Sequence, residues 1–246
     1  LSTLMEFQIR DILIIVKPSD LKLFKNLLGN GSKFGIKINY KIQKKPAGIA
    51  ESFLIGEKFI NKSNVCLILG DNIFHGIPYR EILPQNSNFN GAKIILYKVQ
   101  DPERYGVAKF NKKNKIIKIV EKPKKFISNY AVTGIYFYDN KVINFAKKLK
   151  PSNRNELEIT DINNYYLKES NLKYFKIKPG GVWLDAGTEK SLLQSSLFIQ
   201  TMQERQNIQI SSPEIIAYNN GWISKKKLIS SVTDIKNSYT SFIKNF

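Results

Sequence analysis

Short apolar runs alternate along the chain with amphipathic stretches, and this alternation constrains the fold more than any other feature. Residues 11–16 are predicted to form a strand, because Asp11 is followed by a continuous apolar run, which is typical of a strand buried on both faces. Leu21 and Phe24 then begin a helical pattern that ends at Gly29. Further strands are predicted at 38–43 and 65–69, with a helix between them. We therefore expect an α/β fold, Rossmann-like, with a mostly parallel sheet and helices on both faces.

Two later parts of the chain depart from this alternation. Residues 105–110 and 115–120 follow a two-residue period around a turn at 111–114, which predicts an inserted β-hairpin. Helical patterns follow at 159–168 and 189–206. Because no repeat or linker interrupts the chain, we expect residues 1–246 to form a single domain whose C-terminal part, about 189–246, is helical.

The charge balance is strongly basic, since 39 Lys and Arg residues against 20 Asp and Glu residues give a net charge of +19. The basic residues are spread along the chain and accompany no RNP, zinc-finger or helix-turn-helix pattern. We therefore expect no nucleic-acid partner. A positive field favours anionic substrates instead, such as nucleoside triphosphates and sugar phosphates.

Several other classes of protein are excluded by what the sequence omits. No apolar run approaches the roughly 20 residues of a membrane helix, so we expect no membrane partner. Cys66 is the only cysteine, which rules out an internal disulfide and favours a cytoplasmic location. Its place within an apolar run predicts a buried small hydrophobe. His75 is the only histidine, and without a Ser or Cys partner at a suggestive spacing it supports neither a triad nor a zinc site.

Two aspartates stand where apolar runs end. Asp71 follows the strand at 65–69 and a glycine, at the carboxyl edge where open α/β sheets bind ligands. Asp185 follows Trp183-Leu184 and precedes a predicted helix. A turn explains the first aspartate equally well, and a helix cap explains the second. If the two carboxylates meet, they suit one Mg²⁺ ion whose remaining ligands are water and phosphate.

Two further pairs of residues are candidates for substrate contacts. Glu121 and Lys122 close the hairpin before Pro123, which predicts an extended backbone at Lys122. The lysine suits a sugar phosphate and the glutamate suits sugar hydroxyls, although a solvated charge pair is the alternative. Gln43 offers a donor and an acceptor to a base edge, and Gly48 lets a flat base approach the backbone, unless that glycine serves loop geometry alone.

The order of these motifs resembles that of the bacterial glucose-1-phosphate thymidylyltransferases, a family of sugar nucleotidyltransferases. The resemblance extends over essentially the whole chain. Its most specific blocks are Leu69-Gly-Asp-Asn-Ile-Phe, Asp101-Pro-Glu-Arg-Tyr-Gly-Val, Glu121-Lys-Pro, Ser128-Asn-Tyr-Ala-Val-Thr-Gly-Ile-Tyr-Phe-Tyr-Asp139, Glu156-Leu-Glu-Ile-Thr-Asp161 and Trp183-Leu-Asp-Ala-Gly-Thr188. The segments Glu204-Arg-Gln and Ser212-Pro-Glu-Ile-Ile-Ala-Tyr218 resemble the family's C-terminal helices.

The resemblance implies roles for individual residues. Asp71 and Asp185 fall where the family binds Mg²⁺, and with Lys122 they are the implied catalytic residues. Gln43 and Gly48 fall where it recognises thymine. The positions that line the glucose 1-phosphate site are Gly106, Glu121, Lys122 and Val132. The implied substrates are dTTP and glucose 1-phosphate, joined to dTDP-glucose with release of pyrophosphate for dTDP-rhamnose and polysaccharide synthesis. The resemblance also implies a homotetramer with a regulatory nucleotide site.

One part of the family pattern has no counterpart in this sequence. The Gly-rich loop with its Gly-x-Gly-Thr-Arg stretch, and the Lys-Gln-Leu-Leu-Pro segment after it, are absent. Roughly forty residues, the size of one strand–loop–helix unit, would carry them. We therefore expect an N-terminally truncated domain that lacks its first strand. Because that segment supplies a catalytic arginine and a lysine in the family, we expect the chain alone to be inactive or nearly so.

Three alternatives stay open on the sequence. A related uridylyltransferase would share the motifs but use another nucleotide. A non-catalytic remnant would bind a nucleotide or an intact paralogue. A basic nucleic-acid-binding protein would show a steep loss of affinity with salt and no preference for dTTP.

Overall fold

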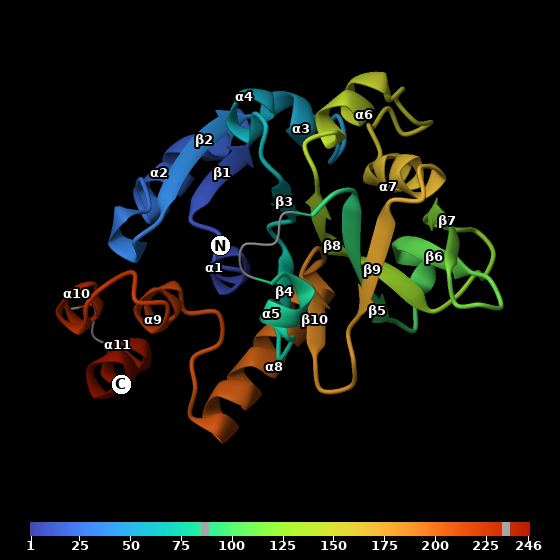
Figure 1. Ribbon diagram of the computed structural model, residues 1–246. Coiled ribbons are helices and arrows are strands. Elements are labelled where there is room, and N and C mark those ends of the chain that lie inside the picture. The colour runs from blue at the N-terminus through green and yellow to red at the C-terminus, as the bar shows by residue number, and fades with distance from the viewer. Residues whose placement is uncertain (85–88, 233–236) are drawn as a thin grey trace.

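The structure is a computed structural model of the 246-residue chain, and it describes residues 1–84, 89–232 and 237–246. The strands are β1 (Asp11–Val16), β2 (Lys37–Ile42), β3 (Val65–Ile68), β4 (Asn72–His75), β5 (Ala92–Lys98), β6 (Gly106–Phe110), β7 (Ile116–Glu121), β8 (Tyr130–Tyr138), β9 (Leu172–Lys176) and β10 (Val182–Asp185). The helices are α1 (Ser2–Glu6), α2 (Leu21–Leu28), α3 (Glu51–Ile55), α4 (Glu57–Ile60), α5 (Tyr79–Ile82), α6 (Val142–Lys148), α7 (Ile159–Lys168), α8 (Glu189–Gln206), α9 (Pro213–Asn219), α10 (Lys225–Ser230) and α11 (Ser238–Asn245). Figure 1 shows their arrangement.

The central sheet is mixed, so the prediction of a mostly parallel sheet is wrong. Its strands follow the order β7-β6-β8-β5-β9, and β3 also pairs with β8. The long strand β8 runs antiparallel to β3, β5 and β6, whereas β5 and β9 are parallel. Strand–helix alternation implies parallel strands only where a helix carries the chain back across the sheet. Between β5 and β8 the chain forms a hairpin instead, and it returns in the opposite direction.

The locally specified parts of the prediction are confirmed. Strands β6 and β7 form the expected antiparallel hairpin, in which Gly106 pairs with Glu121 and Val107 with Val120. Asn111 accepts backbone hydrogen bonds from Lys113 and Lys115 across the turn. Strands β1 and β2 are parallel and are joined by α2, as the first strand and helix predicted.

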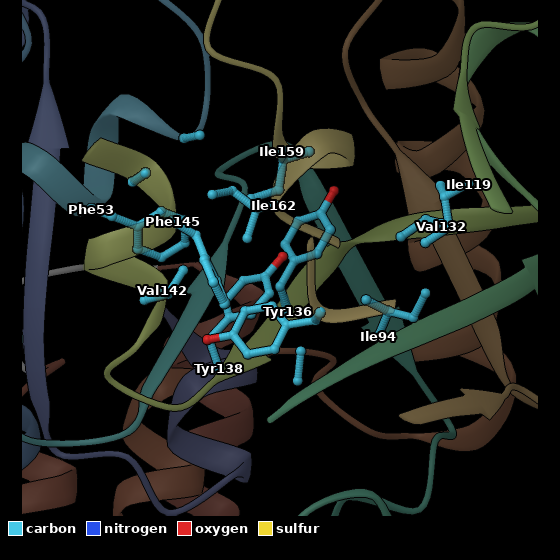
Figure 2. Close-up of a cluster of buried hydrophobic side chains, with 14 of the residues drawn as sticks. Phe53, Ile94, Ile119, Val132, Tyr136, Tyr138, Val142, Phe145, Ile159 and Ile162 are labelled. Atoms are coloured by element: carbon cyan, nitrogen blue, oxygen red, sulfur yellow. The ribbon is translucent and has the colours of Figure 1, made fainter. Parts of the chain in front are cut away.

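Alternate side chains of β5 and β8 face two different cores. One core packs β5 and β8 against α3, α6 and α7, and Figure 2 shows its aromatic centre around Tyr136 and Tyr138. The other core packs the opposite face against the end of α1, α5 and the pair β4–β10. Its members include Ile95, Ile135 and Phe137. Because both faces of β8 are covered, eight consecutive residues of this strand are buried.

The two ends of the chain meet in a third core. Helix α1 and strands β1 and β2 pack against α9, α10 and α11 through Met5, Ile12, Ile38, Leu228 and Ile243. Figure 1 shows the N-terminal and C-terminal segments on the same side of the molecule. Helices α8 to α11 lie in the part predicted to be helical, of which residues 233–236 are outside the described residues. The division into a single domain stays a prediction.

A groove separates β1 from β3. It has a volume of about 530 Å³ and is lined mostly by apolar side chains, among them Ile12, Ile15, Phe59, Leu67 and Phe89. In the described part of the chain, β1 pairs on one edge with β2 and β3 on one edge with β8, so the edges that face the groove are unpaired. Cys66 is half-buried at this groove rather than fully buried as predicted. Its apolar surroundings raise the pKa of the thiol, which keeps it protonated.

Candidate active site

A polar cleft lies where β4, β10 and the hairpin β6–β7 meet the start of α7. Its volume is about 330 Å³, within the range of small-molecule sites. The predicted site residues that line it are Asp71, Gly106, Glu121, Lys122, Val132 and Asp185. Gln43 and Gly48 are not among its lining residues, although Ile49 is. The cleft therefore brings together most of the predicted residues, from segments far apart in the chain, and their roles stay a prediction.

The two predicted metal ligands meet because β4 and β10 pair with each other. The antiparallel register places Asp185 opposite Asn72, next to Asp71. The amide of Ala186 donates to the backbone oxygen of Asp71 at 2.9 Å, which holds the two loops together. An ideal Cβ built on Gly187 would lie 3.0 Å from Asp185 Oδ1 and 3.1 Å from Asp71 Oδ2. Both carboxylates therefore border the same small space.

The other two carboxylate oxygens are held by protein donors. Asp185 Oδ2 accepts hydrogen bonds from Arg104 Nη2 at 3.0 Å and from the Tyr105 hydroxyl at 3.3 Å. Burial, reinforced by the Asp185 carboxylate, raises the pKa of Tyr105 to about 12, so the hydroxyl stays a donor. Asp71 Oδ1 accepts a hydrogen bond from Asn72 Nδ2 at 2.7 Å. These contacts hold one oxygen of each carboxyl group. The other oxygen of each borders the shared space, where Asp185 Oδ1 also accepts a hydrogen bond from the Gly187 amide at 3.1 Å.

Asn72 connects the aspartates to the sheet, and the sequence did not predict this role. Its Oδ1 accepts from the amide of Gly134 at 2.9 Å and from Trp183 Nε1 at 2.6 Å. A Cβ on Gly134 would lie 2.4 Å from that oxygen, so only glycine allows the approach. A glycine inside a long buried strand is a known sign of such a close contact, and here it was the available signal.

The donor set at the aspartates suits a hard divalent cation. Two carboxylate oxygens face a space that a single methyl group would fill, and Mg²⁺ is commonly held by one or two carboxylates with water and phosphate as the other ligands. Across residues 1–84, 89–232 and 237–246, no three His, Cys, Asp or Glu side chains are grouped to hold a metal by themselves. The residues present therefore fit Mg²⁺ that shares its coordination with a bound phosphate.

Lys122 has a backbone that differs from the prediction. Its φ is +41°, in the left-handed region, so the predicted extended conformation is wrong. The following proline disfavours the right-handed helical region. The amide of Lys122 donates to Tyr105 O at 3.0 Å, next to the pair Gly106–Glu121, and so extends the hairpin ladder. A positive φ is uncommon for a residue other than glycine, and Lys122 lies at the wall of the cleft.

Glu121 and its neighbours form a charged wall opposite the aspartates. Glu121 Oε2 accepts a hydrogen bond from Thr160 Oγ1 at 2.5 Å, and a Cβ on Gly106 would lie 3.2 Å from the same oxygen. Arg154 Nη2 lies 3.7 Å from Glu121 Oε1. Gly106 therefore leaves room for the Glu121 carboxyl group. Thr160 lies in one of the resemblance blocks, but the sequence assigned a role neither to it nor to Arg154, because both act through contacts made in the folded chain.

Arg154 also ties the wall to a loop that precedes α7. It bonds Glu158 through Nε at 3.1 Å and Nη2 at 2.8 Å, and its Nη2 lies 3.2 Å from Glu156 Oε2. Ser152 Oγ donates to Glu158 at 2.6 Å. Burial alone would raise the pKa of Glu158, but the hydrogen bonds from Arg154 and Ser152 outweigh it and lower that pKa.

Gln43 and Gly48 lie together, beside the cleft rather than in its lining. Gln43 Nε2 donates to Glu51 Oε2 at 2.6 Å and to Gly48 O at 3.3 Å. Gly48 has a φ of +99°, and a Cβ there would lie 2.5 Å from the backbone nitrogen and oxygen of Leu157. Packing against Leu157 thus requires glycine at this position. A role in base recognition stays a prediction.

Comparison with known proteins agrees with this arrangement. The family described as nucleotidyl transferase matches residues 1–202. A glucose-1-phosphate thymidylyltransferase of Neisseria meningitidis is 48% identical over 99% of this chain and 85% of its own length. One from Xanthomonas campestris is 46% identical over 99% of this chain and 83% of its own. A crystal structure of a putative glucose-1-phosphate thymidylyltransferase from Bacillus anthracis, in complex with a sucrose, has a TM-score of 0.74, 44% identity, and coverage of 80% of this chain and 79% of that one.

The fold, the cleft and these matches define an enzyme that transfers nucleotidyl groups: the chain belongs to the nucleotidyl transferase family. Within that family it stands among the glucose-1-phosphate thymidylyltransferases, which confirms the resemblance of the sequence blocks. In the described residues, no helix is both long and apolar enough to cross a membrane.

Proposed function

We propose that the protein transfers a thymidylyl group from dTTP to glucose 1-phosphate, forming dTDP-glucose and pyrophosphate. The observation that carries this proposal is the convergence of the Asp71 and Asp185 carboxylates on one space, in the cleft that Lys122 also lines. The relatives that cover nearly the whole chain carry the name of this activity. A net charge of +19 favours the approach of both anionic substrates.

The reaction is an in-line displacement at the α-phosphorus of dTTP. A phosphate oxygen of glucose 1-phosphate forms the new P–O bond, the bond to the β-phosphate breaks, and pyrophosphate leaves with those electrons. Bound Mg²⁺, held by Asp71 and Asp185, neutralises charge on the phosphates. No side chain forms a covalent bond, so the protein contributes by positioning and by charge.

In this proposal, different residues of the cleft contact different parts of the two substrates. Lys122 supplies positive charge to the sugar phosphate from a backbone that is hydrogen-bonded to Tyr105 across the hairpin. Glu121, fixed by Thr160, accepts hydrogen bonds from sugar hydroxyls. Gly106 and Val132 line the sugar's space. Gln43 and Gly48 recognise thymine from the loop beside Ile49, which reaches the cleft.

The test is pyrophosphate release with dTTP, glucose 1-phosphate and Mg²⁺, with the nucleotide sugar identified by mass spectrometry. Because the match covers 85% of the length of the Neisseria relative, the assay includes a second version that also carries the part of that relative without a counterpart in this chain. Turnover that needs both substrates supports the proposal. Absence of turnover in both versions contradicts it and favours the non-catalytic alternative.

The nucleotide is tested by competition between dTTP and UTP. We expect preference for dTTP in the active version, and loss of much of that preference when Gln43→Ala removes the amide. Lys44→Ala, an exposed neighbour, is the control. A preference for UTP would favour the uridylyltransferase alternative.

We also infer that the protein assembles as a homotetramer, from the resemblance to its family. Helix α8 carries the exposed side chains Leu192, Leu193 and Leu197, an apolar stripe of the kind that subunit contacts cover. Light scattering coupled to size exclusion measures the assembly, and a monomeric mass at assay concentrations would overturn this inference.

A further inference from the structure

We propose that Gly187 is a positioning residue for the metal site: its missing side chain keeps the space between Asp71 and Asp185 open for a divalent cation. The inference rests on the proposed function, because it assumes that the two aspartates hold Mg²⁺. Gly187 lies in the short connection between β10 and α8, and it would act by having no side chain.

Conformation does not explain a glycine at position 187. Its φ lies outside the left-handed range, so an L side chain is compatible with the backbone. Gly187 is exposed, and no buried packing would be disturbed by a methyl group. By contrast, Gly48 has a left-handed φ and a backbone neighbour at 2.5 Å, which are ordinary reasons for glycine.

The surroundings of Gly187 give the remaining reason. The nearest atoms to an ideal Cβ are Asp185 Oδ1 at 3.0 Å and Asp71 Oδ2 at 3.1 Å, and the next is Asp185 Cγ at 3.9 Å. The Gly187 amide itself donates to Asp185 Oδ1 at 3.1 Å. A methyl group would press on these two carboxylate oxygens more closely than on the third neighbour. Both distances are tighter than ordinary van der Waals contact, so the oxygens would have to move by a few tenths of an ångström.

The opposite sides of the carboxylates cannot absorb that movement freely. Asp185 Oδ2 is bonded to Arg104 and Tyr105, and Asp71 Oδ1 is bonded to Asn72, which Gly134 and Trp183 hold in turn. Mg²⁺ requires near-ideal octahedral geometry, whereas Ca²⁺ accepts longer and more variable bonds. A displaced pair of oxygens will therefore weaken Mg²⁺ more than Ca²⁺.

The experiment is Gly187→Ala, with metal binding followed by electron paramagnetic resonance of Mn²⁺ in the presence of dTTP, measured against dTTP alone and competed with Mg²⁺ or Ca²⁺. Outer-shell changes at metal sites typically cost roughly 10–100-fold in affinity, and we expect a loss of that order for Mg²⁺ and a smaller one for Ca²⁺. We expect the thermal midpoint of the metal-free protein to stay at the wild-type value, because no packed atom is displaced.

Two control variants separate this role from a general disturbance. Gly70→Ala adds the same methyl group beside Asp71 where nothing lies within 4 Å, and we expect wild-type Mg²⁺ competition. Thr188→Ala removes the cap that accepts from the Ser191 amide at 3.1 Å, which weakens the start of α8 without touching the aspartates. We expect a lower thermal midpoint and unchanged metal binding.

Unchanged Mg²⁺ competition in Gly187→Ala overturns the proposal, as does an equal loss in Thr188→Ala or in Gly70→Ala. Wild-type protein without saturable Mn²⁺ binding also overturns it. If the wild-type protein forms dTDP-glucose while Gly187→Ala binds Mg²⁺ normally, only this inference fails. If Gly187→Ala shows the expected loss but no version forms the nucleotide sugar, the proposed function fails and the metal-site inference stands.

Discussion

The cleft of this molecule is smaller than its groove, but it is far richer in charged side chains. The groove between β1 and β3 is larger, about 530 Å³ against about 330 Å³, but apolar side chains line most of it. The cleft gathers five carboxylates with Arg104, Lys122 and Arg154. The polar site lies where strand ends and loops meet, because polar side chains can stay accessible to a ligand there. The apolar groove instead lies along unpaired strand edges, which proteins usually pair or cover.

The largest expected difference between cleft and groove comes from making the same Asp→Asn substitution in each of them. Asp71→Asn removes a charge that the proposed metal site needs, and we expect kcat/KM to fall roughly 10²–10³-fold, the typical cost of losing one preorganised stabilising group. Asp11→Asn, at the groove, removes an exposed carboxylate without a site, so we expect no change. Pyrophosphate release by the active version measures both. Similar losses in the two variants would show that the cleft is not the distinctive site.

The next effect concerns the strained lysine of the cleft wall. Lys122→Gly removes the charge while keeping a backbone that tolerates a φ of +41°. Losing a hydrogen bond to a charged group costs about 1.5–3 kcal/mol, so we expect kcat/KM for glucose 1-phosphate to fall roughly 10–100-fold. The urea midpoint should not fall, because strain is relieved. Lys118→Ala, on the exposed side of the same hairpin, is the control, and a matching loss there would contradict the assignment.

A conservative substitution in the groove is expected to change stability but not activity. Ile12 is 4% exposed and lines the groove, so Ile12→Val removes one buried methylene. We expect a loss of about 0.5–1.5 kcal/mol in the free energy of unfolding from urea denaturation. The kcat/KM of the active version, normalised to folded protein, should not change. A fall in that value would mean that groove and cleft are coupled.

The smallest effect is the pH dependence of the Arg154–Glu158 contact. Because the folded-state pKa of Glu158 lies below its unfolded value near 4.5, the contact stabilises the protein above about pH 4.5 and the effect disappears as pH falls through the folded pKa. Arg154 is partly exposed, so we expect less than about 1 kcal/mol. Urea denaturation of wild type and Glu158→Gln at several pH values measures the difference. A difference that does not shrink in acid would exclude this explanation.

The sequence predicted the local elements well, because their signals are local. The hairpin follows from the turn at 111–114 and its flanking two-residue period, and both are confirmed. The direction of β8 was not predictable in the same way. Backbone hydrogen bonds form in parallel and antiparallel pairs alike, and the choice depends on the path of the connecting chain.

The sequence predicted several residues that line the cleft, but not the contacts that hold them in place. Asp71, Asp185, Glu121 and Lys122 were all expected, and all four line one cleft. Asn72, Thr160 and Arg154 were missed, since their roles depend on partners brought together by folding. Trp183 and Asn72, for example, are bonded across 111 positions of sequence. The left-handed backbone of Lys122 was also missed, because it depends on a hydrogen bond to Tyr105.

By itself, the sequence determined several of the strands and helices, the family that the chain resembles, and the charged residues that are candidates for the site. Those properties depend on side chains that are near one another along the chain. Only the tertiary structure decided that β8 runs antiparallel, that β4 and β10 pair, and that one oxygen of Asp71 and one of Asp185 face the same space beside Gly187. The reason is physical: these arrangements depend on contacts between distant segments, whose geometry is fixed only when the whole core packs.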